Sequence, residues 1–435
     1  KNQNVIGFDG NIEKFKKIKI FQKKLGKDIK IKPVSPNLID LIWKNRPKKL
    51  ISSPFKLPLN FHGEDKSLKI KKIIRHIKTS KKDACILTSC DTICWLFNIR
   101  AQDLEYSPLI MAKSIIHRDG SCFIFSDQKT LKNETLNSKI KIIYKPLHHF
   151  DSHFNEYKDS IGSYLCAPND TSFNVVMLIK EIGAKVIFKD NIVDILKAKK
   201  NTTEENGMRN AHIRDGVALT KFIYWIKNTK NNSQTEISAS NYLDKLRSKN
   251  ENFFSLSFPT IAGSGPNGAI VHYRASNKTN RKLKKDDLFL VDSGAQYFDG
   301  TTDVTRTIAF SKVTYEQKKM YTLVLKGHIA VALSTFNEKE SGKTLDRHAR
   351  KFLKKEKLNF DHGTGHGVGS FLNVHESPPS ISPLSKHKFK KGMIVSNEPG
   401  FYKKNKYGIR IENLVLTRKK QSRLYFETLT VAPLE

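Results

Sequence analysis

A glycine-rich run that carries three histidines is the feature that most constrains this chain. It reads His-Gly-Thr-Gly-His-Gly-Val-Gly from His362 to Gly369 and continues through His375 and Glu376. Glycine lets a backbone pass close to a bulky or charged object. Histidine is a common neutral nitrogen ligand and proton carrier near neutral pH. The run therefore predicts a tight loop at a binding site, most simply a metal site. The alternative is a glycine-rich turn with structural histidines.

The length and composition are those of a globular protein with more than one domain. The chain has 435 residues, of which 38% are hydrophobic and 27% are charged, and two or three domains are expected at this length. No run of eighteen apolar residues exists, so we expect no membrane association. The sequence begins at Lys1 without methionine or an apolar secretory segment, which predicts that it continues a longer chain.

Lysine gives the chain a formal net charge of +35. A charge this large would suit a protein that binds nucleic acid or another acidic surface. However, the basic residues are scattered, lysine outnumbers arginine, and no stripe interleaves basic with aromatic side chains. Clustered arginines would bind phosphate better. We therefore favour compositional drift and expect no nucleic-acid partner.

The five cysteines predict free thiols. They are Cys85, Cys90, Cys94, Cys122 and Cys166, all in the first half of the chain. Their number is odd and none forms a CxxC pair, which fits buried thiols in a reducing compartment better than disulfides or a zinc knuckle.

The pattern of helices and strands divides the chain into three. Residues 1–37 predict a helix and a strand from the end of an α/β domain. Residues 38–198 alternate short apolar strands with amphipathic helices, which predicts a second α/β domain. Residues 199–435 begin with long capped helices and continue with hairpin-like strands, including an extended segment at residues 269–275, which favours an α+β domain.

Four carboxylates in this last part follow or interrupt apolar segments. Asp292 ends the strand "LFLV", Asp303 lies in the next strand, Glu398 precedes Pro399, and Glu412 lies within "YGIRIEN". Acids in apolar strands are unfavourable unless they are paired, hydrogen-bonded or bound to a cation. A hairpin would bring Asp292 and Asp303 side by side.

Four carboxylates and one imidazole form an oxygen-rich ligand set. Such a set can share two divalent ions about 3.5–4 Å apart, as in two-metal hydrolases. Oxygen-dominated ligation with one histidine suits Mn²⁺, with Co²⁺ or Zn²⁺ as alternatives. Each acid taken singly is also explained by a structural salt bridge, but four of them beside the histidine run favour a metal site.

Several segments resemble the signature segments of pita-bread metallopeptidases. They are "DSGAQYFDGTTDVTRT", "HGTGHGVGSFLNVHE", "SNEPGFY" and "YGIRIEN". The three-domain, cytosolic-type Xaa-Pro aminopeptidases are the most similar subgroup, since "NLIDLIWKNRP", "WLFNIRAQDLEYSP", "GMRNAHIRDGVAL" and "AIVHYRA" also resemble them. The resemblance implies an α+β catalytic pita-bread (creatinase/aminopeptidase) domain at residues 199–435. It also implies α/β creatinase-like N-terminal domains, a second one at residues 38–198 and the remnant of a first at residues 1–37.

The resemblance implies a cytoplasmic, homodimeric enzyme that removes an N-terminal residue preceding proline, using a hydroxide bridged by two Mn²⁺ ions. The metal ligands that it implies are Asp292, Asp303, His366, Glu398 and Glu412. Glu398 is also the expected general base. Asp292 and Glu412 are expected to bridge the ions, with Asp303 on one and His366 on the other.

Three further histidines correspond to the family's substrate-handling residues. His375 is expected to donate to the oxyanion, His272 to hold the substrate backbone, and His362 to shape the pocket for the proline ring. We expect Arg410 either to orient a ligand carboxylate or to form an ordinary ion pair. His212, His328 and His348 are expected to be structural or surface residues.

The chain departs from the family pattern at positions that do not bind metal. Ala295 replaces a usual glycine, and "HESPPS" replaces the commoner Gly-Pro after the glutamate. The sequence ends at Glu435, short of the usual tail, and we expect most of the first N-terminal domain to be missing. None of the five ligand positions departs, so we expect an active enzyme.

Two rival functions remain open. A prolidase that cleaves only Xaa-Pro dipeptides, or a methionine aminopeptidase, would use the same site. A non-catalytic pita-bread protein that binds nucleic acid is a rival of another class, and such proteins typically lose metal ligands.

Overall fold

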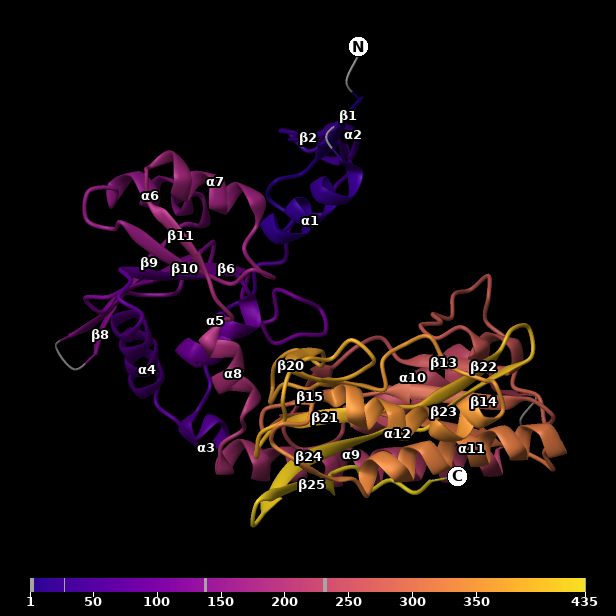
Figure 1. The fold of residues 1–435 in the computed structure, drawn as a ribbon. Coiled ribbons are helices and arrows are strands. Elements are labelled where there is room, and N and C mark those ends of the chain that lie inside the picture. The colour runs from indigo at the N-terminus through magenta and orange to yellow at the C-terminus, as the bar shows by residue number, and fades with distance from the viewer. Residues whose placement is uncertain (1–3, 27, 137–138, 230–232, 435) are drawn as a thin grey trace. The chain divides into compact units, whose positions relative to one another are not determined.

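The computed structural model describes residues 4–26, 28–136, 139–229 and 233–434 (Figure 1). Its internal contacts divide the chain into two compact units. The N-terminal unit comprises Lys1–Lys56, Glu64–Leu104 and Leu109–Val193. The C-terminal unit comprises Leu57–Gly63, Glu105–Pro108 and Asp194–Glu435. The first 37 residues are thus grouped with the N-terminal unit by their contacts, and the change of unit at Asp194 precedes the predicted boundary after residue 198.

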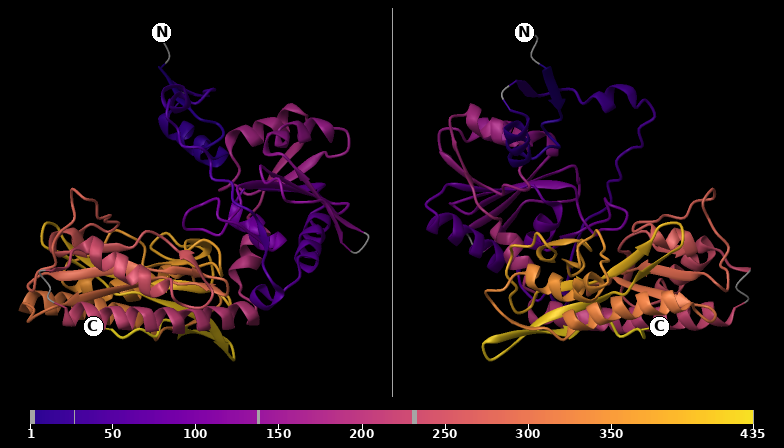
Figure 2. Two further views of the ribbon diagram at one scale, coloured as in Figure 1. Left: turned by 180° about the vertical axis from the view of Figure 1, so that it is seen from behind. Right: turned by 45° about the vertical axis from the view of Figure 1, so that its right-hand side comes forward.

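A mixed sheet of seven strands forms the centre of the N-terminal unit. Its strands, in spatial order, are β11 (Lys185–Phe188), β10 (Ser163–Cys166), β4 (Ala84–Leu87), β6 (Ala112–His117), β7 (Ser121–Ser126), β9 (Ile140–Lys145) and β8 (Glu134–Leu136). Helices α6 (Ser152–Glu156) and α7 (Phe173–Glu181) lie on one side of the sheet, and α4 (Lys66–Thr79) and α5 (Cys90–Phe97) lie on the other (Figures 1 and 2). Coverage of both faces explains why β4, β6, β7 and β10 are buried along nearly their whole length. The predicted α/β architecture of this region is confirmed.

Short elements complete this unit. They are β1 (Asn4–Phe8), α1 (Phe15–Leu25), β2 (Ile29–Pro33), α2 (Leu38–Ile42), β3 (Phe55–Lys56), β5 (Ile99–Arg100) and the 3₁₀ helix η1 (Leu147–Phe150). Strands β1 and β2 form a separate parallel pair joined by α1, which ends at Gly26 as predicted. All five cysteines are free, in agreement with the sequence.

In the part of the chain that the structure describes, six α-helices belong wholly or mainly to the C-terminal unit. They are α3 (Leu59–His62), α8 (Ile192–Ala198), α9 (Thr202–Asn228), α10 (Glu236–Arg247), α11 (Tyr315–Ala332) and α12 (Gly342–Lys355). The predicted caps Asn201 and Thr235 accept from backbone N–H groups and begin α9 and α10. No helix in the described ranges is both long and apolar enough to cross a membrane.

Four small sheets carry the rest of this unit. The six-stranded sheet contains, in spatial order, β18 (Thr335–Asn337), β25 (Arg423–Thr428), β24 (Asn413–Lys420), β21 (Ile394–Asn397), β19 (Gly365–Gly367) and β20 (Glu376–Ile381). Two sheets of three strands contain β13 (Ile261–Ser264), β14 (Leu288–Ser293) and β17 (Val304–Ala309), and β12 (Phe253–Leu256), β15 (Ala295–Tyr297) and β16 (Gly300–Thr301). Strands β22 (Gly400–Lys403) and β23 (Tyr407–Arg410) form a hairpin. One apolar core joins α11 and α12 to the six-stranded sheet, and another joins α9 and α10 to β14 and β17.

Two segments differ from their predicted secondary structure. The middle of the glycine-histidine run is not a loop, because Gly365–Gly367 forms the strand β19 beside β21. The segment at residues 269–275 is not a strand. It follows the 3₁₀ helix η3 (Gly265–Ala269) and turns, with the Tyr273 N–H donating to the carbonyl of Ile270 at 3.1 Å. The Tyr273 hydroxyl holds this turn by donating to Glu236 at 2.8 Å.

Candidate metal centre

The predicted site residues line one cavity of about 410 Å³ in the C-terminal unit. Its lining includes His272, Asp292, Asp303, His362, His366, His375, Glu398, Arg410 and Glu412. Apolar side chains of Phe258, Pro259, Ile261 and Val271 form another part of the wall. A larger hollow beside α1 is lined mainly by apolar residues and lysines and holds no comparable cluster. The carboxylates and histidines that the sequence predicts as site residues therefore lie together in the smaller cavity.

The ends of strands deliver the carboxylates. Antiparallel pairing of β14 with β17 places Asp292 opposite Thr305, and Asp303 directly precedes β17 instead of lying inside it. Glu398 follows β21, where its N–H donates to the Thr364 carbonyl at 2.8 Å. Glu412 lies in the break between β23 and β24, not within a strand. The apolar residues of these strands are buried in the cores described above, so each carboxylate is fixed by its strand.

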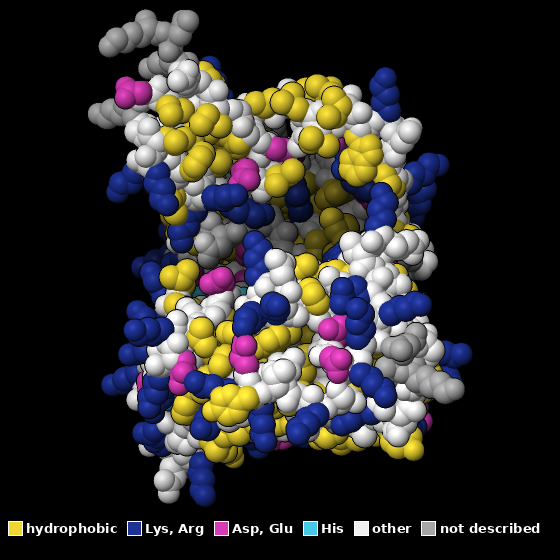
Figure 3. Space-filling view, turned by 90° about the vertical axis from the view of Figure 1, so that its right-hand side faces the viewer, with side chains coloured by type: hydrophobic (Ala, Val, Ile, Leu, Met, Phe, Trp, Pro, Cys, Tyr) yellow, Lys and Arg dark blue, Asp and Glu magenta, His cyan; other side chains and the backbone are white. Residues whose placement is uncertain are grey.

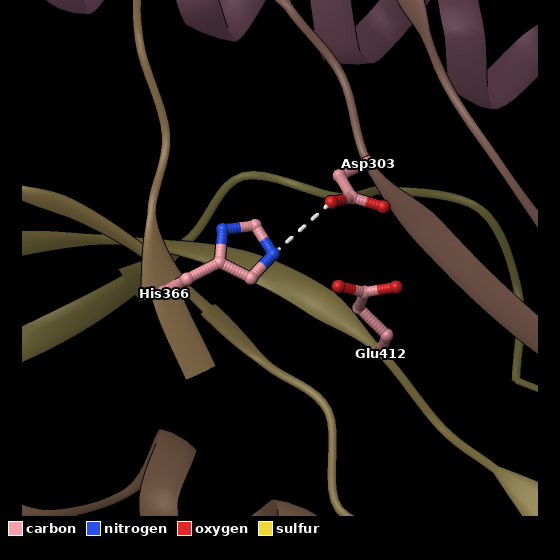
Figure 4. A group of neighbouring side chains, drawn as sticks. All are labelled: Asp303, His366 and Glu412. Carbon is pink, nitrogen blue, oxygen red and sulfur yellow. Dashed lines mark ion pairs between the residues drawn. The ribbon is translucent and has the colours of Figure 1, made fainter. Parts of the chain in front are cut away.

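Three of these side chains converge most tightly. Asp303, His366 and Glu412 each offer a ligand atom, and these atoms lie within 4.8 Å of one another. Figure 4 shows the three side chains pointing toward a common centre from separate segments. The Nε2 atom of His366 is 3.4 Å from Asp303 Oδ2 and 3.6 Å from Glu398 Oε1. Glu398 therefore lies beside the same centre.

Neighbouring groups orient the carboxylates. Arg410 Nη2 donates to Asp292 Oδ2 at 2.7 Å, while the buried Oδ1 of Asp292 has no hydrogen-bond partner among the described residues. The Thr305 hydroxyl donates to Glu412 Oε2 at 2.7 Å, and the Ser396 hydroxyl donates to Glu398 Oε1 at 3.3 Å. Arg410 thus holds a carboxylate of the site, as one of the two sequence interpretations expects.

The carboxylates repel one another in a buried place. Burial raises the pKa of Asp303 well above its usual value, and the charges of Asp292 and Glu398 raise it further. Burial and the charge of Asp303 likewise raise the pKa of Glu412, and burial raises the pKa of Glu398. Divalent cations would remove this repulsion and would satisfy the unpartnered oxygen of Asp292. The donor set therefore fits a pair of divalent metal ions.

His362 belongs to a hydrogen-bond chain that reaches Asp292. The Tyr402 hydroxyl lies 2.8 Å from His362 Nε2 and accepts from Arg410 Nη1 at 2.8 Å. Since the hydroxyl has one proton, it donates to Nε2, and His362 Nδ1 donates to the Gly363 carbonyl at 2.7 Å. Burial lowers the pKa of His362 to about 4, so the ring is neutral. Tyr402 was not among the predicted residues, although the "SNEPGFY" segment contains it.

The other histidines divide as the sequence suggests. The His375 ring stands edge-on to His366 with centroids 4.1 Å apart, and burial followed by the charge of His366 lowers its pKa to about 4. His272 is an exposed residue of the cavity wall. Away from the cavity, His212 and His328 are buried against backbone carbonyls and His348 lies beside the Ser334 hydroxyl at 2.9 Å.

Comparisons with known proteins agree with this geometry. Residues 206–419 match the model of metallopeptidase family M24, and residues 45–204 match the creatinase/prolidase N-terminal domain. A probable Xaa-Pro aminopeptidase P from Paracoccidioides brasiliensis is 38% identical over 92% of this chain and 69% of its own length. The same-named protein of Laccaria bicolor is 37% identical over 93% of this chain and 65% of its own length. The chain thus spans about two thirds of these relatives.

Solved structures show the same fold. The X-prolyl aminopeptidase of Caenorhabditis elegans, described as a cytosolic enzyme with a di-nuclear active site, superposes with a TM-score of 0.93 and 33% identity. The match covers 100% of this chain and 73% of that one. A Bacillus anthracis Xaa-Pro dipeptidase shares the fold with a TM-score of 0.68, at 22% identity over 85% of this chain and 99% of that one. The predicted pita-bread fold and the resemblance are confirmed, and the chain belongs to metallopeptidase family M24.

Proposed function

We infer that this chain is a metal-dependent aminopeptidase that hydrolyses the bond between an N-terminal residue and a following proline. The observation that carries this conclusion is the convergence of four carboxylates, His366 and three further histidines on one cavity. The relatives named Xaa-Pro aminopeptidase P support the proline specificity.

The carboxylates and the imidazole of the cavity are the side chains that would hold the ions. We propose that Asp292, Asp303, His366, Glu398 and Glu412 would together hold two divalent ions. Mn²⁺ is the proposed metal because oxygen donors dominate, with Co²⁺ and Zn²⁺ as alternatives. When bound, such a pair supplies a water whose pKa is lowered enough to give hydroxide near neutral pH.

The side chains of the cavity account for the remaining steps. Glu398 takes the proton of the attacking water and returns it to the proline nitrogen as the peptide bond breaks. His375, neutral at pH 7 because burial lowers its pKa to about 4, donates its N–H to the developing oxyanion. His272 in the cavity wall holds the backbone of the substrate.

Proline needs a dedicated pocket because it has a fixed φ and no N–H. Peptidases that bind that N–H fail at this residue. Both nitrogens of His362 are already used, by Tyr402 and Gly363, so its role is to shape the wall. Together with Phe258, Ile261 and their apolar neighbours it forms a surface suited to the proline ring.

Hydrolysis of an Xaa-Pro-Pro peptide with and without metal tests this proposal. Glu398→Gln and His366→Ala are expected to abolish release of the first residue, whereas Glu338→Gln, which removes an ion pair outside the cavity, is expected to leave it unchanged. Chelation should remove the activity and added Mn²⁺ should restore it. Full activity in a metal-stripped sample would contradict the proposal, and cleavage of Xaa-Pro dipeptides alone would favour a prolidase.

We further propose that the enzyme acts in the cytoplasm as a homodimer and binds peptides with proline at position two. A cytosolic structural relative supports this location. Sedimentation of the purified chain tests the dimer. A salt-sensitive shift of RNA by a metal-free sample would instead favour a nucleic-acid-binding protein.

A further inference from the structure

Arg274 lies in the wall of the cavity, is exposed and has no acidic partner among the described residues. Arg274 interacts electrostatically with the phenol of Tyr106. Burial and Glu105 raise the pKa of this phenol, so it stays neutral at pH 7. Among the described residues of the C-terminal unit, no carboxylate forms an ion pair with the Arg274 guanidinium.

Other arginines around the site are occupied. Arg410 binds Asp292 at 2.7 Å, Arg350 binds Asp346 at 2.9 Å, and Arg247 binds Asp215 at 2.8 Å. A guanidinium carries planar N–H groups that match a carboxylate with two parallel hydrogen bonds. Among these cations, Arg274 alone has that capacity unused, and it faces the substrate cavity.

The fold fixes the direction of the segment that carries Arg274. The preceding Tyr273 is buried, and its hydroxyl lies 2.8 Å from Glu236 and 2.9 Å from the Thr279 carbonyl. The residues on either side, His272 and Arg274, are exposed and both line the cavity. Because Tyr273 anchors the backbone in the core, its two neighbours are held toward the substrate side.

The spacing keeps Arg274 close to His272. Two residues of extended chain span at most about 7 Å, which is also the span of two residues of a bound peptide. If His272 holds the substrate backbone near the bond that breaks, Arg274 lies beside the residues that follow proline. A carboxylate there is the complementary group.

We propose that Arg274 is a specificity residue that favours peptides carrying a carboxylate on the residue after proline. This inference rests on the proposed aminopeptidase function and deepens it. The carboxylate has two sources, the free C-terminus of an Xaa-Pro-Yaa tripeptide or an acidic side chain at the third position. A hydrogen-bonded ion pair at an exposed site corresponds to an effect of about 5- to 20-fold in kcat/KM.

Four peptides separate these sources. Ala-Pro-Gly is compared with its C-terminal amide, and the amide of Ala-Pro-Asp-Gly with that of Ala-Pro-Asn-Gly. The metal-loaded wild type is expected to prefer the acid in at least one pair, through a lower KM. Arg274→Gln should abolish that preference without lowering kcat on the amides, and Arg274→Lys should keep part of it.

The control is Lys278→Gln, which removes one positive charge from an exposed residue nearby that does not line the cavity. It should leave the acid-to-amide ratio unchanged. Calorimetric binding of Ala-Pro-Gly and its amide to Glu398→Gln gives the same comparison without turnover. Equal kcat/KM for acids and amides in the wild type, or an unchanged preference in Arg274→Gln, would overturn the inference while leaving the aminopeptidase intact. Failure of the wild type to cleave any of the four would overturn the proposed function itself.

Discussion

At the scale of single residues, Arg410 joins two parts of the site. One of its nitrogens binds the carboxylate of Asp292 and another binds the Tyr402 hydroxyl, which in turn fixes the neutral form of His362. Burial and the charge of Arg410 act in opposite directions on Tyr402, and burial prevails, raising the pKa of Tyr402 to about 12. The hydroxyl therefore stays protonated and keeps its role as donor to His362.

Arg410→Lys is expected to weaken metal binding by about 10- to 100-fold, the usual effect of losing a group that orients a metal ligand. Lysine keeps the charge but cannot reach Asp292 and Tyr402 with a planar fork. Metal titration by calorimetry measures the change. Tyr402→Phe serves as the control, since it removes one of the two contacts and should have the smaller effect. Wild-type metal affinity in Arg410→Lys would refute this role.

At the scale of elements, strand β19 needs its glycines to lie where it does. A Cβ at Gly365 would come within 1.9 Å of the Ser396 carbonyl oxygen. No side chain fits so close to that oxygen, which explains why glycine occupies this position in the strand between β21 and β20. Strand β19 in turn positions His366.

Gly365→Ala is therefore expected to displace β19, to lower thermal stability and to remove most activity. The matched control is Gly363→Ala in the same run, where a new Cβ would meet no atom closer than 3.5 Å. Thermal unfolding and peptide hydrolysis of the two variants check the prediction. Equal behaviour of both variants would show that the close approach at Gly365 is unimportant.

Strand β20 begins with a buried carboxylate held by two lysines. Glu376 contacts Lys197 at 3.0 Å and also Lys200, and all three side chains are at most 1% exposed. This cluster anchors the residue that follows His375. The negative charge of Glu376 compensates the two buried ammonium groups, which would be unfavourable in the interior without it.

Glu376→Gln is expected to destabilise the C-terminal unit by about 3–5 kcal/mol, the usual result of removing one partner from a buried ion pair. Glu338 offers a matched control because it also lies between two lysines, Lys390 and Lys419, but at the surface. Glu338→Gln should change stability little. Denaturant unfolding compares them, and similar losses in both variants would contradict the argument from burial.

The sequence predicted most elements and the carboxylates and histidines that line the cavity, but not the hydrogen bonds that connect them. Helix caps such as Asn201 and apolar runs such as that before Asp292 act locally, so their patterns are visible along the chain. The strand at Gly365–Gly367 was missed because its neighbour β21, not its own propensity, determines it. The chain from His362 through Tyr402 to Asp292 was missed because it links segments far apart in sequence.

At the scale of the whole molecule, charged side chains are spread over the surface, whereas some titratable side chains are buried in the interior. Figure 3 shows lysine and arginine side chains spread over one face with acidic ones among them, not gathered in one patch. Compositional drift as the origin of the net charge of +35 predicts such a spread, and it stays a prediction. The N-terminal unit, by contrast, contains a buried pair of titratable side chains, His117 and His153.

These two histidines predict acid sensitivity of the N-terminal unit. Their Nε2 atoms are 3.1 Å apart beside Phe123 and Tyr157, and burial lowers the pKa of His117 to about 4 and that of His153 to about 3. Below pH 6.5 these two histidines bind protons in the unfolded chain but stay neutral in the folded unit. Stability is therefore fully present above pH 6.5 and is lost as the pH falls toward 4, by up to about 1.4 kcal/mol per pH unit for each histidine.

Thermal unfolding between pH 7 and pH 5 checks this prediction. His117→Gln should reduce the pH dependence, because one buried titrating group is gone. His148→Gln, at an exposed position of the same unit, should leave it as in the wild type. A pH dependence that persists unchanged in His117→Gln would show that other groups cause it.

The hydrogen bonds of Arg306 to the C-terminal segment have a consequence for how the enzyme folds during synthesis. Its guanidinium binds the carbonyls of Glu412, Ala432 and Pro433 at 2.7, 2.8 and 2.7 Å. Asp292, the first of the proposed metal ligands along the chain, thus leaves the ribosome well before the segment that completes its pocket. A chain released before this segment would lack both Glu412 and the carbonyls that bind Arg306. Competence should arise in one late step, and fragments cut short before Glu412 should be inert instead of partly active.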